Sequence, residues 1–410
     1  MRWHARQAAF PGIALLFAFA TACSGATTTV TTTASVSAST SPSVTTSPSP
    51  STPATWRVAA PVPTWDESQT SVWDGHEVLA FGRRSVNGAP YCQDYAYAYD
   101  PSTDVWRTLP PAPGPVGCFE GGDKAVWTGN EVLLWGVTNT AYDPATNRWR
   151  HLPQPPAGAG GPSVAVWTGE QMIGWGGGCC GGAYGDGAAY TPRTNSWKLL
   201  PPSPLSPRHT TGTWTGTEMI LAGGSGPEGY NGNPVFRDAA AYDPSTRTWR
   251  KLPPMPIPRE GGTMVWDGTE ALLVGGDSSG LAHQVRGVAF DPSTDRWRWL
   301  PPMTYPRFLD VVVWAGDQLI VWGGLREPSA ADQAAGRWWA GGVPPNGESY
   351  DPATNAWSAL PTAPLRGRTQ ASAVWTDSEV LIWGGFDARK PDASPMVVLK
   401  TAAALTPASA

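Results

Sequence analysis

The sequence is poor in charge, and it contains no run of basic residues. Only 15% of its 410 residues are charged, with 33 acidic and 28 basic side chains. A patch or stripe of Lys and Arg is the electrostatic feature that nucleic acids and anionic lipids require. Its absence argues against nucleic-acid binding and favours partners of neutral or mixed charge.

Histidine is scarce as well, with five residues in the whole chain. Only His209 and His283 fall in segments that the repeat described below assigns to one face of the fold. Two imidazoles do not define a metal site, and no metal motif is visible. We therefore expect neither a metal nor another cofactor.

Long apolar runs are absent except at the N-terminus. Basic residues there precede an apolar stretch, 8–20, which ends in small residues before Cys23. This pattern is typical of a secretory signal peptide, here residues 1–22. Cys23 resembles the acylated cysteine of a bacterial lipobox, although Ala20 stands where Leu is usual. We expect an exported, lipid-anchored protein at the outer face of the cytoplasmic membrane or in the cell envelope. The alternative is ordinary cleavage beside an incidental cysteine.

The next segment is almost entirely Ser, Thr, Pro, Ala and Val up to residue 54. Such a composition cannot bury a core and stays extended or coiled. Residues 23–54 are therefore predicted to be a lipidated cysteine and a tether, which spans roughly 30 Å as a flexible coil. The folded domain is predicted over residues 55–410.

Tryptophan, glycine and proline are abundant, with 23, 47 and 43 residues, and they recur in two phrases. In the first, an aromatic residue and a Trp are seven positions apart, and a Leu-Pro step follows. This phrase occurs at Tyr99/Trp106, Tyr142/Trp149, Tyr190/Trp197, Tyr242/Trp249, Phe290/Trp297 and Tyr350/Trp357. In the second, a Trp precedes a tight turn and an apolar run that ends in Gly. It occurs at Trp73, Trp127, Trp167, Trp214, Trp266, Trp314 and Trp375.

Each unit therefore supplies four short strands, since the turns and the β-branched runs beside them are hairpin signals. The unit length is close to the roughly 50 residues of a kelch blade. The Gly pair after the second strand, as in Gly223-Gly224, followed by the spaced aromatic and Trp, resembles the kelch repeat. That resemblance, to kelch propellers such as the central domain of galactose oxidases, covers residues 55–410.

The resemblance implies an all-β, seven-bladed β-propeller with four-stranded blades. The seventh unit ends at its third strand, whereas Thr55-Trp56-Arg57 imitates a fourth strand near the N-terminus. We expect this N-terminal strand to close the last blade, which removes the free sheet edges of an open ring. Eighteen of the Trp residues are expected to pack in the core between blades.

The loops that join strands two and three, and those that join successive blades, vary most in length and share one face. Binding residues favour such loops, so we place the ligand mouth there. In kelch propellers that bind peptides or sialic-acid-like ligands, an Arg in a Pro-Arg step lines the pocket. The positions that correspond to that Arg, with three loop tryptophans, are Arg208, Arg259, Arg307, Arg368, Asp66, Glu120, Trp65, Trp338 and Trp339. The alternative is that the arginines pair with Asp66, Glu120, Glu260 and Asp310 around the channel. The three tryptophans would then cap the small core of their own loops.

Four cysteines fall on the same face, in a compartment where disulfides persist. Four cysteines allow three pairings. Cys92 with Cys118, in neighbouring blades, is the pair that we favour. A bond between the adjacent residues Cys179 and Cys180 would be strained, because consecutive Cα atoms are only ~3.8 Å apart.

The function favoured by these features is a monomeric, non-catalytic binding module of the cell envelope. It would recognise a carbohydrate or a protein partner on the variable-loop face. The alternative is an enzyme that acts on a carbohydrate by acid/base chemistry, like an epimerase or mutarotase. Its proton shuttle would be one of Glu120, Glu260 and Asp310. Fold alone does not choose between them.

Overall fold

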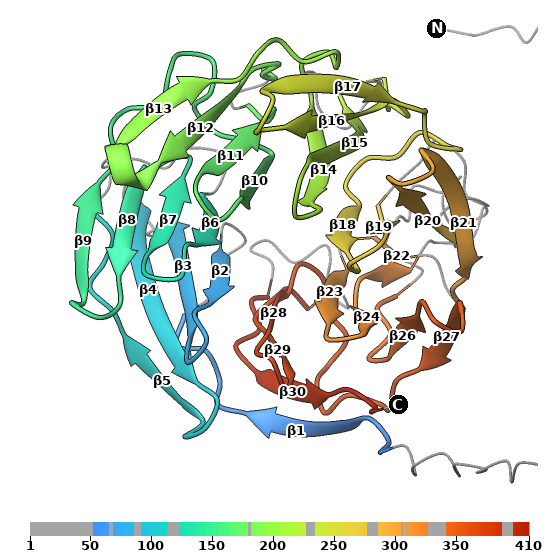
Figure 1. Ribbon diagram of the computed structural model, residues 1–410. Coiled ribbons are helices and arrows are strands. Elements are labelled where there is room, and N and C mark those ends of the chain that lie inside the picture. The colour runs from blue at the N-terminus through green and yellow to red at the C-terminus, as the bar shows by residue number, and fades with distance from the viewer. Residues whose placement is uncertain are drawn as a thin grey trace, which may run out of the picture. The chain divides into compact units, whose positions relative to one another are not determined.

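A computed structural model of the chain describes eleven segments, and the statements below concern these residues. They are 52–64, 69–85, 92–113, 123–178, 182–226, 234–276, 286–304, 307–308, 310–326, 342–387 and 397–409. Within them, seven four-stranded antiparallel sheets are arranged around one axis as the blades of a propeller (Figure 1). This confirms the predicted all-β fold and the number of blades.

The innermost strand of each blade faces the axis, and most of its residues are only partly buried. In six of the blades it ends on the Trp of the second phrase, and in blade six this Trp is the next-to-last residue. The seven first strands, in blade order, are β2 (Thr70–Trp73), β6 (Lys124–Trp127), β10 (Val164–Trp167), β14 (His209–Trp214), β18 (Thr263–Trp266), β23 (Val311–Ala315) and β28 (Ser372–Trp375).

The second and third strands form the buried middle of each blade. Strands such as Val132–Trp135 are buried at every residue, because neighbouring blades cover both faces of the sheet. The second strands are β3 (Val78–Ser85), β7 (Val132–Trp135), β11 (Met172–Trp175), β15 (Met219–Ser225), β19 (Ala271–Val274), β24 (Gln318–Trp322) and β29 (Val380–Trp383). The third strands are β4 (Cys92–Asp100), β8 (Thr140–Asp143), β12 (Gly187–Thr191), β16 (Ala239–Asp243), β20 (Arg286–Asp291), β26 (Gly347–Asp351) and β30 (Ala402–Thr406).

The fourth strand lies at the rim, where one face of the strand meets solvent. The fourth strands are β5 (Val105–Thr108), β9 (Arg148–His151), β13 (Ser196–Leu199), β17 (Thr248–Leu252), β21 (Arg296–Pro302), β27 (Ala356–Ala359) and β1 (Thr55–Ala59). The short 3₁₀ helix Pro192–Thr194 precedes β13, and β22 (Arg307–Phe308) pairs with β25 (Leu325–Arg326) beside blade six.

The chain ends close the ring as the sequence predicted. The N-terminal strand β1 pairs with β30 and becomes the fourth strand of blade seven, with Trp56 opposite Leu405. Figure 1 shows these two strands side by side, although they lie at opposite ends of the folded domain. Each blade therefore has neighbours on both sides.

The spaced aromatic and Trp of the first phrase are direct cross-strand partners. Tyr142 lies opposite Trp149, for example, with ring centroids 4.9 Å apart, and the five other pairs repeat this geometry. The Asp that follows the aromatic accepts backbone N–H bonds, as Asp143 does from Ala145, which is the Asx-turn role of this residue. The indole N–H of Trp149 donates to the carbonyl of Pro110 in the preceding blade, 2.8 Å away. The Leu-Pro step is therefore an acceptor for the next blade.

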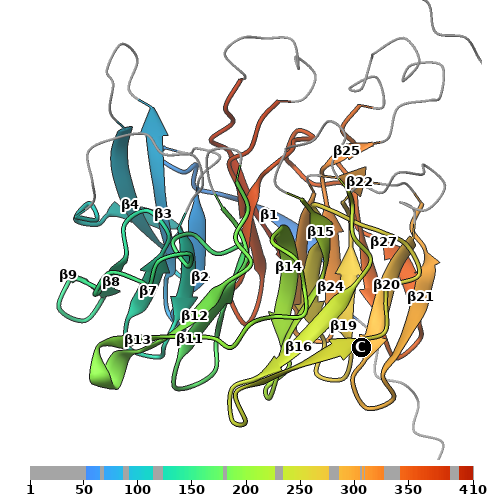
Figure 2. The same cartoon turned by 90° about the horizontal axis from the view of Figure 1, so that it is seen from above.

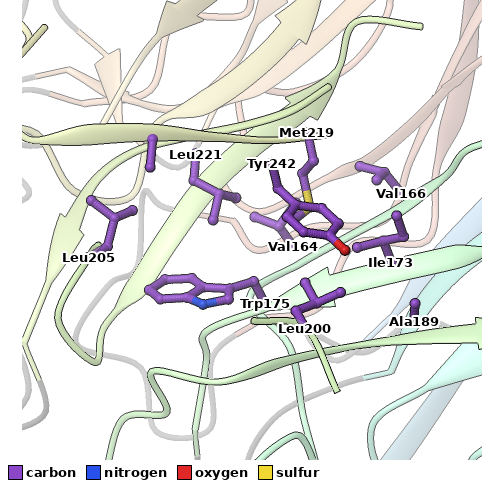
Figure 3. Close-up of a cluster of buried hydrophobic side chains, with 11 residues drawn as sticks. Val164, Val166, Ile173, Trp175, Ala189, Leu200, Leu205, Met219, Leu221 and Tyr242 are labelled. Atoms are coloured by element: carbon purple, nitrogen blue, oxygen red, sulfur yellow. The ribbon is translucent and has the colours of Figure 1, made fainter. Parts of the chain in front are cut away.

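The core consists of layers between adjacent blades. Figure 3 shows the layer between blades three and four, where Trp175 and Leu200 meet Leu221 and Tyr242. Trp135, Trp175, Trp322 and Trp383 are at most 1% exposed. This confirms the core role that the sequence predicted for the tryptophans at the end of the second strand.

The two faces of the ring differ in their connections. On one face, which we call the turn face, strands one and two are joined by a four-residue loop. It closes by the same backbone bond in six blades, as from Thr128 N–H to the carbonyl of Glu131 at 3.0 Å. The other face, the loop face, carries the connections between strands two and three and between successive blades. Figure 2 shows the ring edge-on, with β22 and β25 on the loop face.

Candidate functional site

Several residues predicted for the mouth lie outside the described segments. These are Trp65, Asp66, Glu120, Trp338 and Trp339, together with His283 and with Cys23, Cys118, Cys179 and Cys180. Cys92 begins β4, and its backbone lies opposite Ser85 of β3. The cysteine pairings remain predictions, as does the recognition role of the five loop residues.

The four predicted arginines lie on the loop face, one in each of blades four to seven, and all are buried. Their exposed fractions are 1% for Arg208, 2% for Arg259, 0% for Arg307 and 1% for Arg368. Each precedes the innermost strand of its blade, and each makes the same main contact. One Nη1–H donates to the carbonyl of the first Gly of the pair at the end of the second strand. These carbonyls belong to Gly223 (3.4 Å), Gly275, Gly323 (2.9 Å) and Gly384 (2.7 Å).

A second contact connects each guanidinium to the residue just before the third strand or close to it. Arg208 forms an ion pair with Asp238, at 2.5 Å, and Arg259 donates to the carbonyl of Arg286 at 2.7 Å. Arg307 reaches the carbonyl of Asn346 at 3.1 Å, and Arg368 reaches both the carbonyl and the hydroxyl of Thr401. The guanidinium therefore bonds residues at both ends of the connection between strands two and three of its own blade.

The backbone of the same arginines docks against the preceding blade. The carbonyl of Arg259 accepts the N–H of Gly224 in blade four, at 2.7 Å. A Cβ on Gly223 would lie 2.5 Å from that carbonyl oxygen, and the φ angle of Gly223 is +63°. Only glycine meets both conditions without strain. The Gly pair and the Pro-Arg step of the sequence are thus two halves of one contact between blades.

These contacts describe a structural task for the arginines. Buried guanidinium groups that hold backbone carbonyls give the variable loops a rigid base. Arg208 pairs with Asp238, and Arg307 lies 3.6 Å from Glu348. The alternative pairing predicted from the sequence named Asp66, Glu120, Glu260 and Asp310. The first two lie outside the described residues, and the charges of Arg307 and Arg259 act on the carboxyl of Asp310. Nothing observed here tests a direct role of the four arginines in ligand recognition, which stays a prediction.

Asp310 is a predicted proton shuttle whose surroundings change the pKa of its carboxyl. It lies between β22 and β23, and its Oδ2 atom is buried without a hydrogen-bond partner among the described residues. Burial raises the pKa of the Asp310 carboxyl to about 6, although the nearby charges of Arg307 and Arg259 oppose the shift. A carboxyl with this pKa can both accept and donate a proton near neutral pH. Glu120 lies outside the described residues.

Lys124 is a loop-face residue that the sequence analysis missed. It is the first residue of β6 and is exposed, and the protein around it lowers the pKa of its ammonium group. The pKa of His209, at the start of β14, is lowered first by burial and then by the positive charge of Lys124. The sequence contained a signal for Lys124, because it stands three residues before Trp127, the Trp of the first strand (the inner Trp) of its blade. Lys124 places a cation in blade two, for which the sequence analysis named only the acidic residue Glu120.

Two features are absent from the described residues. These residues contain no cluster of three or more His, Cys, Asp and Glu side chains that could hold a metal ion. Among the same segments, no helix is long and apolar enough to cross a membrane.

Comparison with known proteins agrees with this geometry. The model of the KLHDC2/KLHL20/DRC7 Kelch-repeats domain matches residues 122–324, which contain blades two to five and the first two strands of blade six. No curated protein matches the chain. Blades one, six and seven repeat the same four-stranded arrangement, and blades one and six keep the same aromatic pair, whereas Leu405 lies opposite Trp56 in blade seven. Residues 122–324 are thus similar to a kelch-repeat domain, and the described residues as a whole form a seven-bladed β-propeller.

Proposed function

We propose that the chain is an interaction module of the cell envelope that binds a protein partner on its loop face. Kelch propellers commonly bind protein partners, and the fold by itself suggests a module of this kind. The observation that carries the proposal is the contrast between the two faces. The loops of the turn face are short and are closed by the same backbone bond. The connections of the loop face differ in length, and the buried arginines bond residues at their ends.

Site-specific photo-crosslinking tests this proposal in cells that make the full chain. The photoreactive residue would replace Val398, a partly exposed loop-face residue of blade seven, and in a matched control Thr217, an exposed turn-face residue of blade four. We expect a protein adduct from position 398 and none from position 217. An adduct from position 217 alone would contradict the proposal. A glycan adduct at position 398 would indicate that the partner is a carbohydrate and not a protein.

The proposed location rests on the N-terminal segment. A signal peptide over residues 1–22 and an acylated Cys23 would anchor the propeller through the Ser/Thr/Pro-rich tether. The change Cys23→Ala should move the protein from the membrane fraction to the soluble fraction and leave the melting temperature unaltered. Membrane association that survives the change would contradict lipid anchoring.

An acid/base enzyme is the second candidate, and Asp310 is the observation that favours it. A buried carboxyl with a pKa of about 6 is suited to proton transfer on a sugar. The test is NMR-monitored mutarotation of glucose and galactose with the full chain and with the Asp310→Asn variant. Acceleration by the parent chain that the variant lacks would support this candidate. No acceleration by the parent chain would exclude mutarotation of these two sugars.

A further inference from the structure

A cavity of about 570 Å³ lies on the turn face, where blades two and three meet. Its lining comes from the first turn of each blade and from the turn before β13. It includes Trp167, Glu170, Gln171 and Lys198. Figure 1 shows the two blades, β6–β9 and β10–β13, side by side. The cavity is therefore separate from the loop-face residues discussed above, and its volume lies within the range of small-molecule sites.

The cavity coincides with a departure from the repeat. In five blades, the residue after the Trp of the fourth strand (the outer Trp) is an Arg. This Arg forms an ion pair with the Glu that ends the turn between strands one and two. These pairs are Arg57/Glu379, Arg107/Glu77, Arg150/Glu131, Arg250/Glu218 and Arg298/Glu270. Blade three has Lys198 and Gln171 at the two positions, and blade six has Ser358 and Gln318. Gln171 donates to the hydroxyl of Thr191 at 3.1 Å, and Lys198 has no hydrogen-bond or ion-pair partner among the described residues. The bidentate pair is therefore missing in blade three, and the ammonium group of Lys198 is available to a ligand.

Trp167 supplies an aromatic wall. It ends β10, and one side of the ring packs on the core layer around Val126 and Leu133. The residue is only partly buried, and within the described part of the chain its indole N–H has no hydrogen-bond partner. An indole held in this way is a rigid platform with one polar edge.

The polar groups of the lining exclude most other ligand classes. Glu170 and Lys198 are exposed and oppose each other in charge, and Asn130 and Gln171 supply amide donors and acceptors. Glu131, Asp143 and Arg193 also line the cavity, but Glu131 is paired with Arg150 and Asp143 accepts the bonds of its own turn. A strongly anionic ligand would meet the carboxylate, and a cation would meet the ammonium group. A purely apolar ligand would leave these polar side chains without hydrogen-bond partners. A ligand with many hydroxyls and one apolar face satisfies both the aromatic wall and these donors and acceptors.

We propose that this turn-face cavity binds a neutral saccharide unit, with one face of the sugar ring against Trp167 and its hydroxyls bonded to Glu170, Gln171 and Lys198. The site goes beyond the proposed function, because it lies on the opposite face of the propeller and does not depend on the partner bound there.

Saturation-transfer NMR on the full chain tests the proposal, with glucose and cellobiose as neutral probes and inorganic phosphate, observed by ³¹P titration, as the anionic control. We expect saturation of the sugar ring protons and no phosphate binding. The deciding variant is the double change Gln171→Glu with Lys198→Arg. It restores the ion pair of five other blades and so takes the Lys198 cation and the Gln171 amide away from the ligand. The sugar should therefore bind at least about tenfold more weakly, which corresponds to a loss of about 1.4 kcal/mol. The fold should be retained, as an unchanged or raised melting temperature would show.

Two further variants separate the cavity from the rest of the surface. Glu170→Ala should weaken sugar binding, whereas Thr217→Ala, the equivalent position in blade four, should leave binding unchanged. Two results would overturn the proposal, namely no saturation transfer to either sugar, or transfer that persists in the double variant. Phosphate binding that competes with the sugar would also overturn it, because the site would then select anions. Failure of loop-face crosslinking would leave these outcomes unaffected.

Discussion

At the scale of single residues, the buried arginines of the loop face show how one side chain can support a whole connection. Arg307 is fully buried and bonds the carbonyls of Gly323 and Asn346, and Glu348 is its ionic neighbour. Removal of the guanidinium would leave these acceptors and the carboxylate without their partner inside the protein. A buried group in that state costs more than the original bond contributed.

We therefore expect Arg307→Ala to lower the free energy of unfolding by about 3 kcal/mol, measured by urea denaturation. Arg307→Lys should recover part of the loss, since an ammonium group can reach one carbonyl but lacks the planar fork. The exposed turn-face residue Arg296 provides the control, and Arg296→Ala should change stability by less than about 0.5 kcal/mol. If Arg307→Ala has the same stability as the parent chain, the structural role is wrong, and the predicted role of Arg307 in ligand binding is then favoured.

Asp310 gives a pH-dependent prediction. Its pKa is raised from 3.8 to about 6, first by burial, so the folded state disfavours the ionised form. The neutral carboxyl contributes stability that is fully present below a pH of about 4 and is lost as the pH rises through about 6. Asp310→Asn removes the ionisation. The variant should be more stable than the parent chain by about 1–3 kcal/mol at neutral pH, and the difference should vanish near pH 4. An equal difference at both pH values would show that Asp310 does not titrate in this range.

At the scale of strands and blades, the indole N–H of each outer Trp joins neighbouring blades. Trp249 donates to the carbonyl of Pro201 at 2.9 Å, and the fourth-strand tryptophans of the six other blades make the same bond to the preceding blade. Trp249→Phe keeps most of the ring packing and removes this donor. We expect a loss of about 1–2 kcal/mol, measured by thermal and urea denaturation.

The inner Trp of the same blade is a matched control. Trp214 packs on the same core layer, but its indole N–H has no hydrogen-bond partner among the described residues. Trp214→Phe should therefore destabilise the protein less than Trp249→Phe does. Equal losses would mean that ring volume decides the stability at both positions and that the bond to Pro201 contributes little.

At the scale of the whole molecule, ring closure depends on a strand of five residues, β1. Its backbone pairs with β30 along five positions, and its side chains reach both neighbouring blades. Trp56 donates to the carbonyl of Pro361 at 2.9 Å, and Arg57 contacts Glu379 of blade seven and Asp104 of blade one. Without β1, the strand β30 would present an unpaired edge, and the contact of Arg57 with Asp104 of blade one would be lost.

A chain that begins at Pro61 should therefore unfold at a lower temperature than a chain that begins at Ser51, and it should associate through the exposed edge. Thermal unfolding followed by circular dichroism, with light scattering for association, measures both effects. Identical melting temperatures would contradict closure by β1. Addition of a peptide with the sequence of residues 51–60 should restore part of the lost stability, because the peptide can pair with β30.

The sequence by itself determined the architecture, because the propeller repeats one local pattern seven times. Each Trp turn, Gly pair and spaced aromatic reports a contact within a blade or to the next one, so their spacing is readable from the chain. Closure was predictable for the same reason, since Trp56 and Arg57 imitate the Trp-Arg pair of complete fourth strands.

The tertiary structure alone decided which contacts the polar residues make and how far they are buried. Whether Arg259 faces a ligand or holds Gly275 depends on the distance between segments 16 residues apart, and no local pattern contains that distance. The burial that raises the pKa of Asp310 comes from the surrounding protein, far beyond the neighbouring residues in the chain. The turn-face cavity likewise arises only when Lys198 and Gln171, 27 positions apart, are set beside blade two. Local patterns specify strands and turns, whereas burial and charge are sums over residues that meet only in the folded ring.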